Sequence, residues 1–389
     1  MRPGRVTLLS VSTLLTLVLV GGGFFLQVGA GESSYRQAVL FAEVLSLVME
    51  NYVDPLDSDE ALRGAYEGML SGLDPQGAFL SAEEVEAWKA TTMGDADPGF
   101  TLLKSGRSMQ VVALRAESAA AEAGIELGDQ LRSIDGLPVR NLSLAQARRA
   151  LSGESGTDVV VEIVDPGEGF QRNELVLQRR IPSEPAYRVE VVEGIAVLEI
   201  DDLSRIDMKQ LADELGNVGS RGVSELLVDL RNVAEDVTRD VAVVGRWFGK
   251  KTLLRLREPS GRQLETVQGT RGPAIWEGRV AVLVNSATAG AAEAFTVLLR
   301  DYAEATVYGE KTYGLGSEAR LFELESGVGL LVSAAVWETE AGSRWYESGV
   351  RPDVEVSGEG ENYIGIQGDQ LQQVLNRIKE DANADDPPA

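Results

Sequence analysis

The sequence predicts a multidomain chain of the α/β (α+β) class, with a core built on a parallel sheet. Residues 226–230 and 280–284 are near-continuous apolar runs, which are typical of central strands covered on both faces. Helical stretches at 207–215 and 291–300 alternate with such runs, as in a parallel sheet with packed helices. Residues 94–182 differ, because short strand-like runs are broken there by glycines, and this indicates an inserted β-rich module, resembling a small β-barrel.

A helical N-terminal segment is expected over residues 31–93. Apolar residues recur there at helical spacing and form one stripe. These are Leu40, Val44, Leu47 and Val48. The turn at 73–77 contains Pro and Gly and should interrupt the helices. A second helix should begin after Ser81, with Glu84 in the capping-box position, and Ser143 with Gln146 predicts a similar start within the β-rich module.

Composition excludes several kinds of chemistry. The 389 residues carry a net charge of −25, which repels phosphate backbones and makes nucleic-acid binding a poor expectation. The chain contains no cysteine and no histidine, so disulfides, thiolate metal sites and a Ser-His-Asp triad are excluded. Any hydrolytic base would have to be Lys or a carboxylate. No cofactor and no metal site are predicted.

The N-terminus resembles an export signal. Arg2 and Arg5 precede an apolar run over 6–28, and residues 28–30 fit a small-residue cleavage site. The run is also long enough to span a bilayer, so residues 1–30 are a signal peptide or a membrane anchor. Either alternative places the remaining chain outside the cytoplasm, in the periplasm or on the outer face of the cytoplasmic membrane.

The other end of the chain is polar and acidic. Residues 358–389 form an acidic tail in which a helix is expected over 370–379. The final ten residues are expected to be disordered.

Residues 94–182 resemble a PDZ domain. The matching segments are Gly99-Phe100-Thr101-Leu102, Ala123-Gly124-Ile125-Glu126-Leu127-Gly128-Asp129, Ile134-Asp135-Gly136-Leu137-Pro138-Val139, and Gly153 after the capped helix. In such a module a glycine-containing turn presents N–H groups to a terminal carboxylate, and the peptide adds to the sheet edge. The resemblance implies a peptide-binding groove formed by Gly99, Phe100, Thr101, Leu102, Ala147 and Leu151. Alternatively, this groove is only a structural gate on the neighbouring domain.

Residues 35–356 resemble the carboxyl-terminal processing, or tail-specific, serine peptidase family, with the protease-like α/β core at 183–357. The matching motifs follow the family order. They are Glu50-Asn51-Tyr52-Val53-Asp54-Pro55, the segment 68–75, Val228-Asp229-Leu230-Arg231-Asn232, the segment 282–285, Gly309-Glu310-Lys311-Thr312-Tyr313-Gly314 and the segment 349–354. The resemblance implies a serine-type endopeptidase fold with an embedded PDZ domain.

The residues that the family uses for catalysis are substituted. The family's Ser-Lys dyad maps onto Gly290 and Leu315, and the glutamine that assists the lysine maps onto Ala319. The family's glycine-rich oxyanion turn is replaced by a turn with Glu235 and Asp236, whose charges would oppose a forming oxyanion. No catalytic residue is therefore predicted to be intact.

Three functions are compatible with these residues. The first is an inactive homologue, or pseudoprotease, that holds C-terminal peptide tails or a partner protease. The second is an active peptidase with a relocated nucleophile and base, for which the candidates are Ser286, Thr288, Ser317 and Lys311. The third is a structural subunit that pairs with an active homologue.

Overall fold

The computed structural model describes residues 32–54, 57–90, 93–166, 171–235, 238–249, 251–270, 275–357 and 367–385. The described residues fall into two units that divide after Ala65. The expected signal or anchor at 1–30 and the turn residue Asp236 lie outside the described residues. Within the part of the chain that is described, no helix is long and apolar enough to cross a membrane.

The first unit is helical. It contains α2 (Glu32–Asn51) and the first part of α3 (Ser58–Ser71). The apolar stripe predicted at residues 40–48 therefore lies on a helix, as expected.

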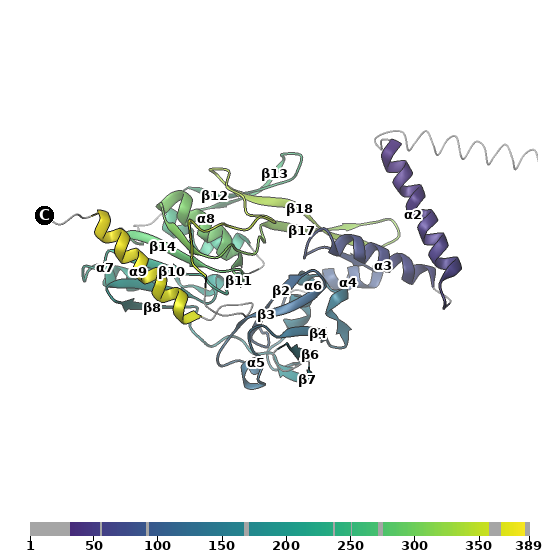
Figure 1. The fold of residues 1–389 in the computed structure, drawn as a ribbon, viewed down its shortest axis with the longest axis horizontal. Coiled ribbons are helices and arrows are strands. Elements are labelled where there is room, and N and C mark those ends of the chain that lie inside the picture. The colour runs from purple at the N-terminus through teal and green to yellow at the C-terminus, as the bar shows by residue number, and fades with distance from the viewer. Residues whose placement is uncertain are drawn as a thin grey trace, which may run out of the picture. The chain divides into compact units, whose positions relative to one another are not determined.

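A six-stranded sheet forms the centre of the second unit (Figure 1). Its strands, in spatial order, are β19 (Val354–Glu355), β16 (Thr306–Gly309), β14 (Arg279–Val284), β10 (Glu225–Asp229), β9 (Ile195–Ile200) and β8 (Tyr187–Val192). The first five are parallel, and only β8 joins antiparallel at the edge. This confirms the predicted parallel sheet.

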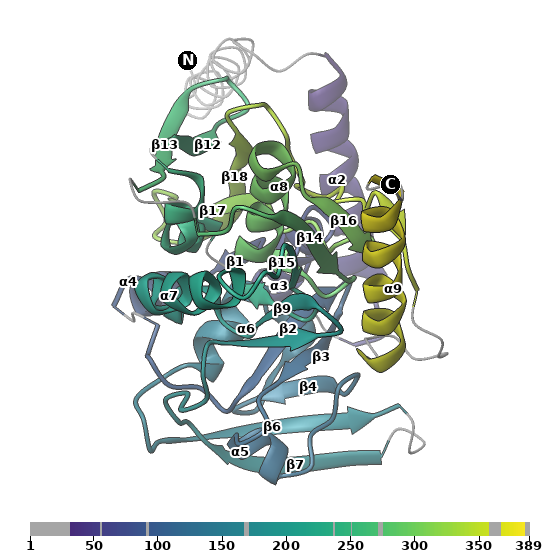
Figure 2. The same cartoon turned by 90° about the vertical axis from the view of Figure 1, so that its left-hand side faces the viewer.

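Both faces of this sheet are covered, which explains why its central strands are almost wholly apolar. On β10, Leu226 and Val228 pack into one buried cluster and Leu227 into another, because alternate side chains point to opposite faces. The first cluster includes α7 (Met208–Gly219), α8 (Ala291–Ala303) and the 3-10 segment η3 (Thr238–Phe248). The second is closed by α9 (Gln367–Asp385), yellow in Figures 1 and 2.

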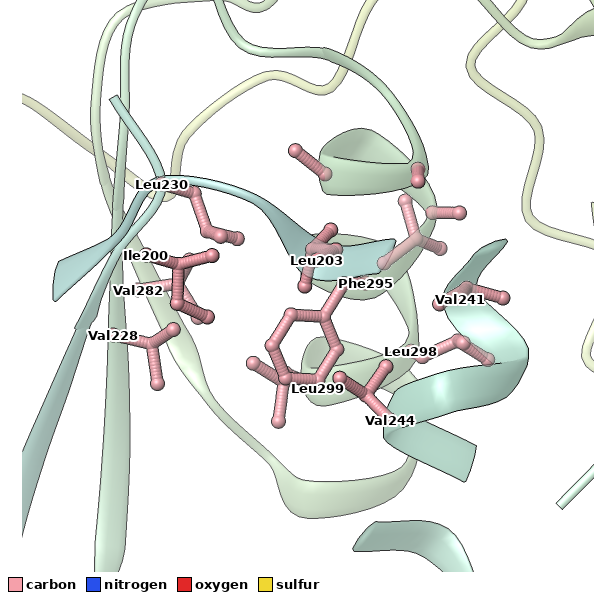
Figure 3. Close-up of a cluster of buried hydrophobic side chains, with 14 of the residues drawn as sticks. Ile200, Leu203, Val228, Leu230, Val241, Val244, Val282, Phe295, Leu298 and Leu299 are labelled. Carbon is pink, nitrogen blue, oxygen red and sulfur yellow. The ribbon is translucent and has the colours of Figure 1, made fainter. Parts of the chain in front are cut away.

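Phe295 of α8 lies at the centre of the larger cluster (Figure 3). Its ring has no exposed surface and contacts the rings of Trp247 and Phe248 edge-on, at centroid distances of 5.6 and 6.2 Å. Val228 of β10 and Val282 of β14 lie on one side of it, and Val241 and Val244 of η3 lie on the other. This packing holds the start of α8 firmly against the ends of the parallel strands.

A second sheet is antiparallel. It consists of β1 (Ala78–Leu80), β18 (Gly329–Thr339), β12 (Thr252–Arg257), β13 (Gln263–Gln268) and β17 (Ser317–Glu323), which also pairs with β18. Strand β1 corrects the expectation that residues 31–93 are helical outside the turn. A three-residue strand has too little periodicity to be recognised in a sequence, and it exists because β18 offers an edge.

The β-rich module forms its own sheet, with β5 (Leu137–Pro138) added beside β4. The strands follow the order β2 (Phe100–Ser105), β3 (Ser108–Leu114), β4 (Gln130–Ile134), β6 (Asp158–Asp165) and β7 (Gln171–Gln178). Its helices are α5 (Ala119–Glu122), η1 (Val139–Asn141) and α6 (Leu144–Leu151). Figure 2 shows these strands stacked below the parallel sheet.

Both predicted capping boxes are present. Ser81 and Glu84 exchange hydrogen bonds at the start of α4 (Ala82–Ala90), and Ser143 and Gln146 do so at the start of α6.

The C-terminal helix is longer than predicted, since α9 runs to Asp385. The expectation of disorder is therefore wrong for residues 380–385. The helix is held on the sheet by a hydrogen bond from Tyr308 to Asp381 and by the buried side chains of Val374, Leu375 and Ile378.

We expect Phe295→Ala to lower the free energy of unfolding by about 3–5 kcal/mol, because it leaves a cavity in a close-packed cluster. Chemical denaturation monitored by circular dichroism measures this change. The matched control is Phe322→Ala, since that ring is 45% exposed and should lose much less. Equal losses in the two variants would contradict the central position assigned to Phe295.

Candidate functional site

Gly290 occupies a sharp turn between a strand and a helix. It ends the two-residue strand β15 (Ala289–Gly290) and caps the first turn of α8. Its backbone has φ 64° and ψ −117°, a combination that only glycine adopts without strain. The turn therefore has a sharp strand-to-helix geometry at a position that is buried and carries no side chain.

The carboxylate of Glu293 joins this turn to a second loop. It accepts hydrogen bonds from the backbone N–H groups of Gly290, Gly314 and Leu315 at 3.0, 2.6 and 2.7 Å, and from the hydroxyl of Thr312. Burial raises the pKa of Glu293 to about 7, and these four donors oppose the rise. The two positions that the resemblance assigned to the dyad, 290 and 315, are thus fixed to one carboxyl group.

The side chain of Leu315 is surrounded by other apolar side chains. Its side chain is 2% exposed and belongs to the buried cluster of the β-rich module, together with Leu102, Ala147 and Ala289. The neighbouring Tyr313 strengthens this contact, because its hydroxyl donates to the carbonyl of Lys104 at 2.6 Å. The loop at 313–315 therefore serves as packing surface between the module and the core.

The turn after β10 lies beside Gly290. Asn232 and Asn285 exchange two hydrogen bonds, one from the backbone N–H of Asn232 and one from the amide of Asn285. Strand β11 (Ala234–Glu235) then pairs in parallel with β15, with Glu235 in register with Gly290. The structure thus brings Glu235 next to position 290, as the resemblance implied.

The carboxyl group of Glu235 is buried, and only one of its two oxygens has a hydrogen-bond partner in the described chain. Its Oε1 accepts from the backbone N–H of Leu203 at 2.5 Å, whereas its Oε2 is buried and has no hydrogen-bond partner in the described chain. Burial, reinforced by the nearby charge of Asp202, raises the pKa of Glu235 to about 8.

The residues predicted to bind peptide have two different environments. Gly99 has φ 100°, and a Cβ there would lie 2.0 Å from Cβ of Ser118, so only glycine fits this turn. Its N–H already donates to Asp97. Phe100 and Thr101 follow at the start of β2, whereas Leu102, Ala147 and Leu151 are almost completely buried in the cluster shared with Leu315.

Arg148 was missed by the sequence analysis and lies at the centre of this contact. From α6, its guanidinium donates to the carbonyl of Leu102 at 3.2 Å and to that of Ala234 at 3.3 Å. Burial lowers the pKa of Arg148 to about 10. The signal was available, because Arg148 shares the helical stripe of Leu144, Ala147 and Leu151, where an arginine is unusual.

A cavity of about 550 Å³ opens between the module and the core. Gly99, Phe100, Thr101 and Leu151 line it from the module, and residues 232–235 line it from the core. Its charged lining consists of Asp95, Asp97, Glu184, Glu199, Asp201, Asp202, Asp229, Glu235 and Asp240, with Arg115, Arg148, Arg188, Arg205 and Arg231. The volume is in the range of small-molecule and peptide side-chain sites.

Most of the arginines in this cavity are already paired. The ion pairs are Arg115 with Asp97, Arg188 with Glu199 and Asp201, Arg205 with Asp202, and Arg231 with Asp229. Among the described residues, no group of three or more acidic side chains is arranged to hold a metal ion.

The residues considered as relocated catalysts are dispersed. The hydroxyl of Thr288 donates to the carbonyl of Leu230 and accepts from the backbone N–H of Asn285, and it has no exposed surface. Ser286 and Lys311 are exposed, and Ser317 shares a hydrogen bond with Ser333. Ala319 is half-buried on β17 after a bulge.

Comparison with known proteins agrees with this architecture. Residues 194–356 match the model of peptidase family S41, and residues 110–165 match that of the PDZ domain. The carboxyl-terminal-processing protease of Synechocystis sp. is 29% identical over 318 residues, covering 79% of this chain and 74% of that protein. A probable CtpA-like serine protease of Staphylococcus epidermidis is 24% identical over 359 residues, covering 91% and 72%. The solved structure of a photosystem II D1 C-terminal processing protease has the same fold, with a TM-score of 0.57 at 24% identity, covering 82% of this chain and 93% of that one.

The fold and the inserted module therefore define an S41-type peptidase scaffold with an embedded PDZ domain. Over most of its length the chain is similar to carboxyl-terminal-processing proteases.

We expect the melting temperature to fall as pH rises from about 5 to about 8.5. A carboxyl group whose pKa is raised by folding stabilises the folded state below its ordinary pKa, and this contribution is lost as pH rises through the folded pKa. Glu235, at about 8, and Glu293, at about 7, both act in this window. Differential scanning calorimetry across the pH series measures the slope.

The variant Glu235→Gln should be less sensitive to pH between about 7 and 9, since the titrating group is removed. Exposed Glu325 provides the matched control, because Glu325→Gln removes the same charge outside the site. A wild-type curve that is flat or rises with pH over this range would contradict the assignment.

Proposed function

We propose that this chain is a non-hydrolytic member of its protease family that binds C-terminal peptide tails. The observation that carries the proposal is the pair of side chains at the dyad positions. Gly290 has nothing with which to attack a carbonyl group, and Leu315 is buried in an apolar cluster and accepts no proton. Both positions belong to a well-formed frame, so the scaffold is present while the reacting groups are missing.

The turn beside Gly290 supports the same proposal. An acyl-transfer transition state needs hydrogen-bond donors where negative charge develops. Here the adjacent residue is Glu235, whose Oε2 is an acceptor with no donor of its own. Losing a single oxyanion donor typically costs about 100- to 1000-fold in rate.

A relocated dyad is the alternative, and the contacts of the candidate residues weigh against it. Thr288 uses its hydroxyl to join Leu230 and Asn285, which is a structural role at the end of the sheet. Lys311 is exposed, so burial does not prepare it as a base.

Peptide capture is supported by the PDZ fold and by the cavity at the Gly99 turn. Strand β2 is an edge strand of its sheet in the described chain, which is the place where a peptide strand adds. Because Arg148 bonds to the carbonyl of Leu102, a tail that extended along β2 would compete with this arginine. The tail therefore enters at the cavity end, near Gly99 and Phe100. A partner protease that presents such a tail is a second possible ligand.

We also propose an extracytoplasmic location, in the periplasm or on the outer face of the cytoplasmic membrane. The support is the sequence of residues 1–30, where Arg2 and Arg5 precede an apolar run. A reporter fused after Ala389 that is active only in the cytoplasm would contradict this location.

We expect residues 31–389 to show no peptidase activity on an unfolded protein with an apolar C-terminus. The double variant Gly290→Ser with Leu315→Lys should cleave this substrate only slowly. Adding Ala319→Gln, Glu235→Gly and Asp236→Gly should raise the rate of cleavage. Serine at the φ and ψ of position 290 should cost about 1–3 kcal/mol of stability. Product formation by mass spectrometry and thermal melts of each variant measure both effects.

The outcome that refutes this proposal is turnover by the wild type that Thr288→Ala or Lys311→Ala abolishes. Such a result would establish relocated chemistry. A folded five-site variant without activity would mean that the scaffold has diverged beyond its missing side chains.

We expect the full-length chain to bind a peptide with an apolar C-terminus at micromolar affinity, or about −8 kcal/mol. Fluorescence anisotropy with a labelled decapeptide measures this affinity. The matched ligand is the same peptide with an amidated C-terminus, which lacks the terminal carboxylate that a PDZ domain captures. Equal affinity for the two peptides would rule out carboxylate capture as the mechanism.

A further inference from the structure

The cavity between the PDZ domain and the core has more negative charge than its own arginines can balance. Nine carboxylates and five guanidiniums line it. Four of the five guanidiniums are ion-paired with carboxylates of the same wall, and Arg148 donates to two carbonyl groups. The surplus is therefore acidic, and it faces a space large enough for a ligand side chain.

The carboxylates in this cavity are close enough to repel one another. Burial is the main cause that disfavours the charged forms of Glu235 and Asp201, and the neighbouring arginines Arg148 and Arg188 oppose it. Nearby carboxylates add to the effect of burial, namely Asp202 and Asp240 at Glu235, and Glu199, Glu184 and Asp202 at Asp201. A positive charge placed among these groups would relieve the repulsion, because an opposite charge at short distance favours an ionised carboxylate.

Glu235 provides an independent sign that a donor belongs there. Glu235 is one of the residues that line the cavity, and its Oε2 is buried and has no hydrogen-bond partner in the described chain. Leaving a buried acceptor without a donor is unfavourable, so a ligand that supplies one would be stabilised there. An ammonium or guanidinium group would supply both the missing hydrogen bond and the missing charge.

We propose that this cavity selects basic peptide tails, by binding a Lys or Arg side chain of the peptide against Glu235 and Asp202. The proposal rests on the proposed tail-binding function and adds its specificity. A peptide fits better than a free cation, because apolar side chains line the same cavity. Phe100, Leu127 and Leu151 lie on the module side, opposite the acidic core side. One ligand that satisfies both walls carries an apolar end and a basic residue.

The test compares two acetylated decapeptides that end in the same three apolar residues and differ only by Lys-Lys or Gln-Gln upstream. Isothermal titration with the full-length chain at pH 7 measures both affinities. We expect the basic peptide to bind at least about tenfold more tightly at low salt, with the ratio falling toward about threefold at high salt as screening increases.

Charge attraction by the whole acidic protein must be distinguished from binding in the cavity. Glu235 loses its proton when a cation binds beside it, so the basic peptide should release up to about one proton at pH 7. Titrations in two buffers with different ionisation enthalpies measure this release. The variants Glu235→Gln and Asp202→Asn keep the shape and hydrogen bonding of the side chains. Each should reduce the preference by about threefold or more, and Glu235→Gln should abolish the proton release. The control Glu325→Gln removes the same charge at an exposed position and should change neither.

Two results would overturn the inference while leaving the proposed function intact. One is equal affinity for the two peptides. The other is a preference that Glu235→Gln and Asp202→Asn leave unchanged and that releases no proton, which would mean general charge attraction. If neither peptide binds, the proposed tail-binding function fails together with its specificity.

Discussion

One buried carboxylate, that of Glu293, determines the geometry of the site. It accepts from the backbone of Gly290 at the start of α8 and from the backbone of Gly314 and Leu315 in the facing loop. These elements are separated by more than twenty residues of chain, and beside this carboxylate the backbone N–H of Tyr313 also donates to the carbonyl of Thr288 at 3.1 Å. A buried carboxylate is costly unless donors surround it, so its four donors must all be in place. The relative position of 290 and 315 is therefore fixed whatever side chains they carry.

The frame around positions 290 and 315 is therefore independent of the side chains at those two positions. The residues that hold the frame are Glu293, Thr312, Asn285 and Asn232, and none of them depends on a nucleophile or base. Thr312 also accepts from the backbone N–H of Val350, which ties the loop to the final strand region. Selection for stability preserves such contacts because each loss would leave a buried polar group unsatisfied.

Local patterns made much of this structure predictable. The apolar runs at 226–230 and 280–284 predicted strands covered on both faces, and Ser81 and Ser143 predicted helix starts, because these signals lie within a few residues. Strand β1 and the contact of Leu315 with Leu102 were not predicted, since both depend on residues more than 200 positions apart. Arg148 was missed because its partners, the carbonyls of Leu102 and Ala234, belong to elements that only the folded chain brings together. In the candidate site, the resemblance placed Glu235 near position 290, but no sequence pattern predicted that its Oε2 would lack a hydrogen-bond partner.

The leucine at position 315 also stabilises the contact between the PDZ domain and the core. A lysine at this place would put an ammonium into a cluster of Leu102, Ala147 and Ala289, where burying an unpaired charge is costly. Leucine instead gains about 1.5–3 kcal/mol from burial, which stabilises the contact of the PDZ domain with the core. The hydroxyl of Tyr313 and the guanidinium of Arg148 add directional bonds across the same contact. Opening the groove along β2 would break all three interactions, whereas the cavity at Gly99 is already open. The contact around Leu315 therefore closes the groove along β2, and of the two ends only the cavity beside Gly99 is open.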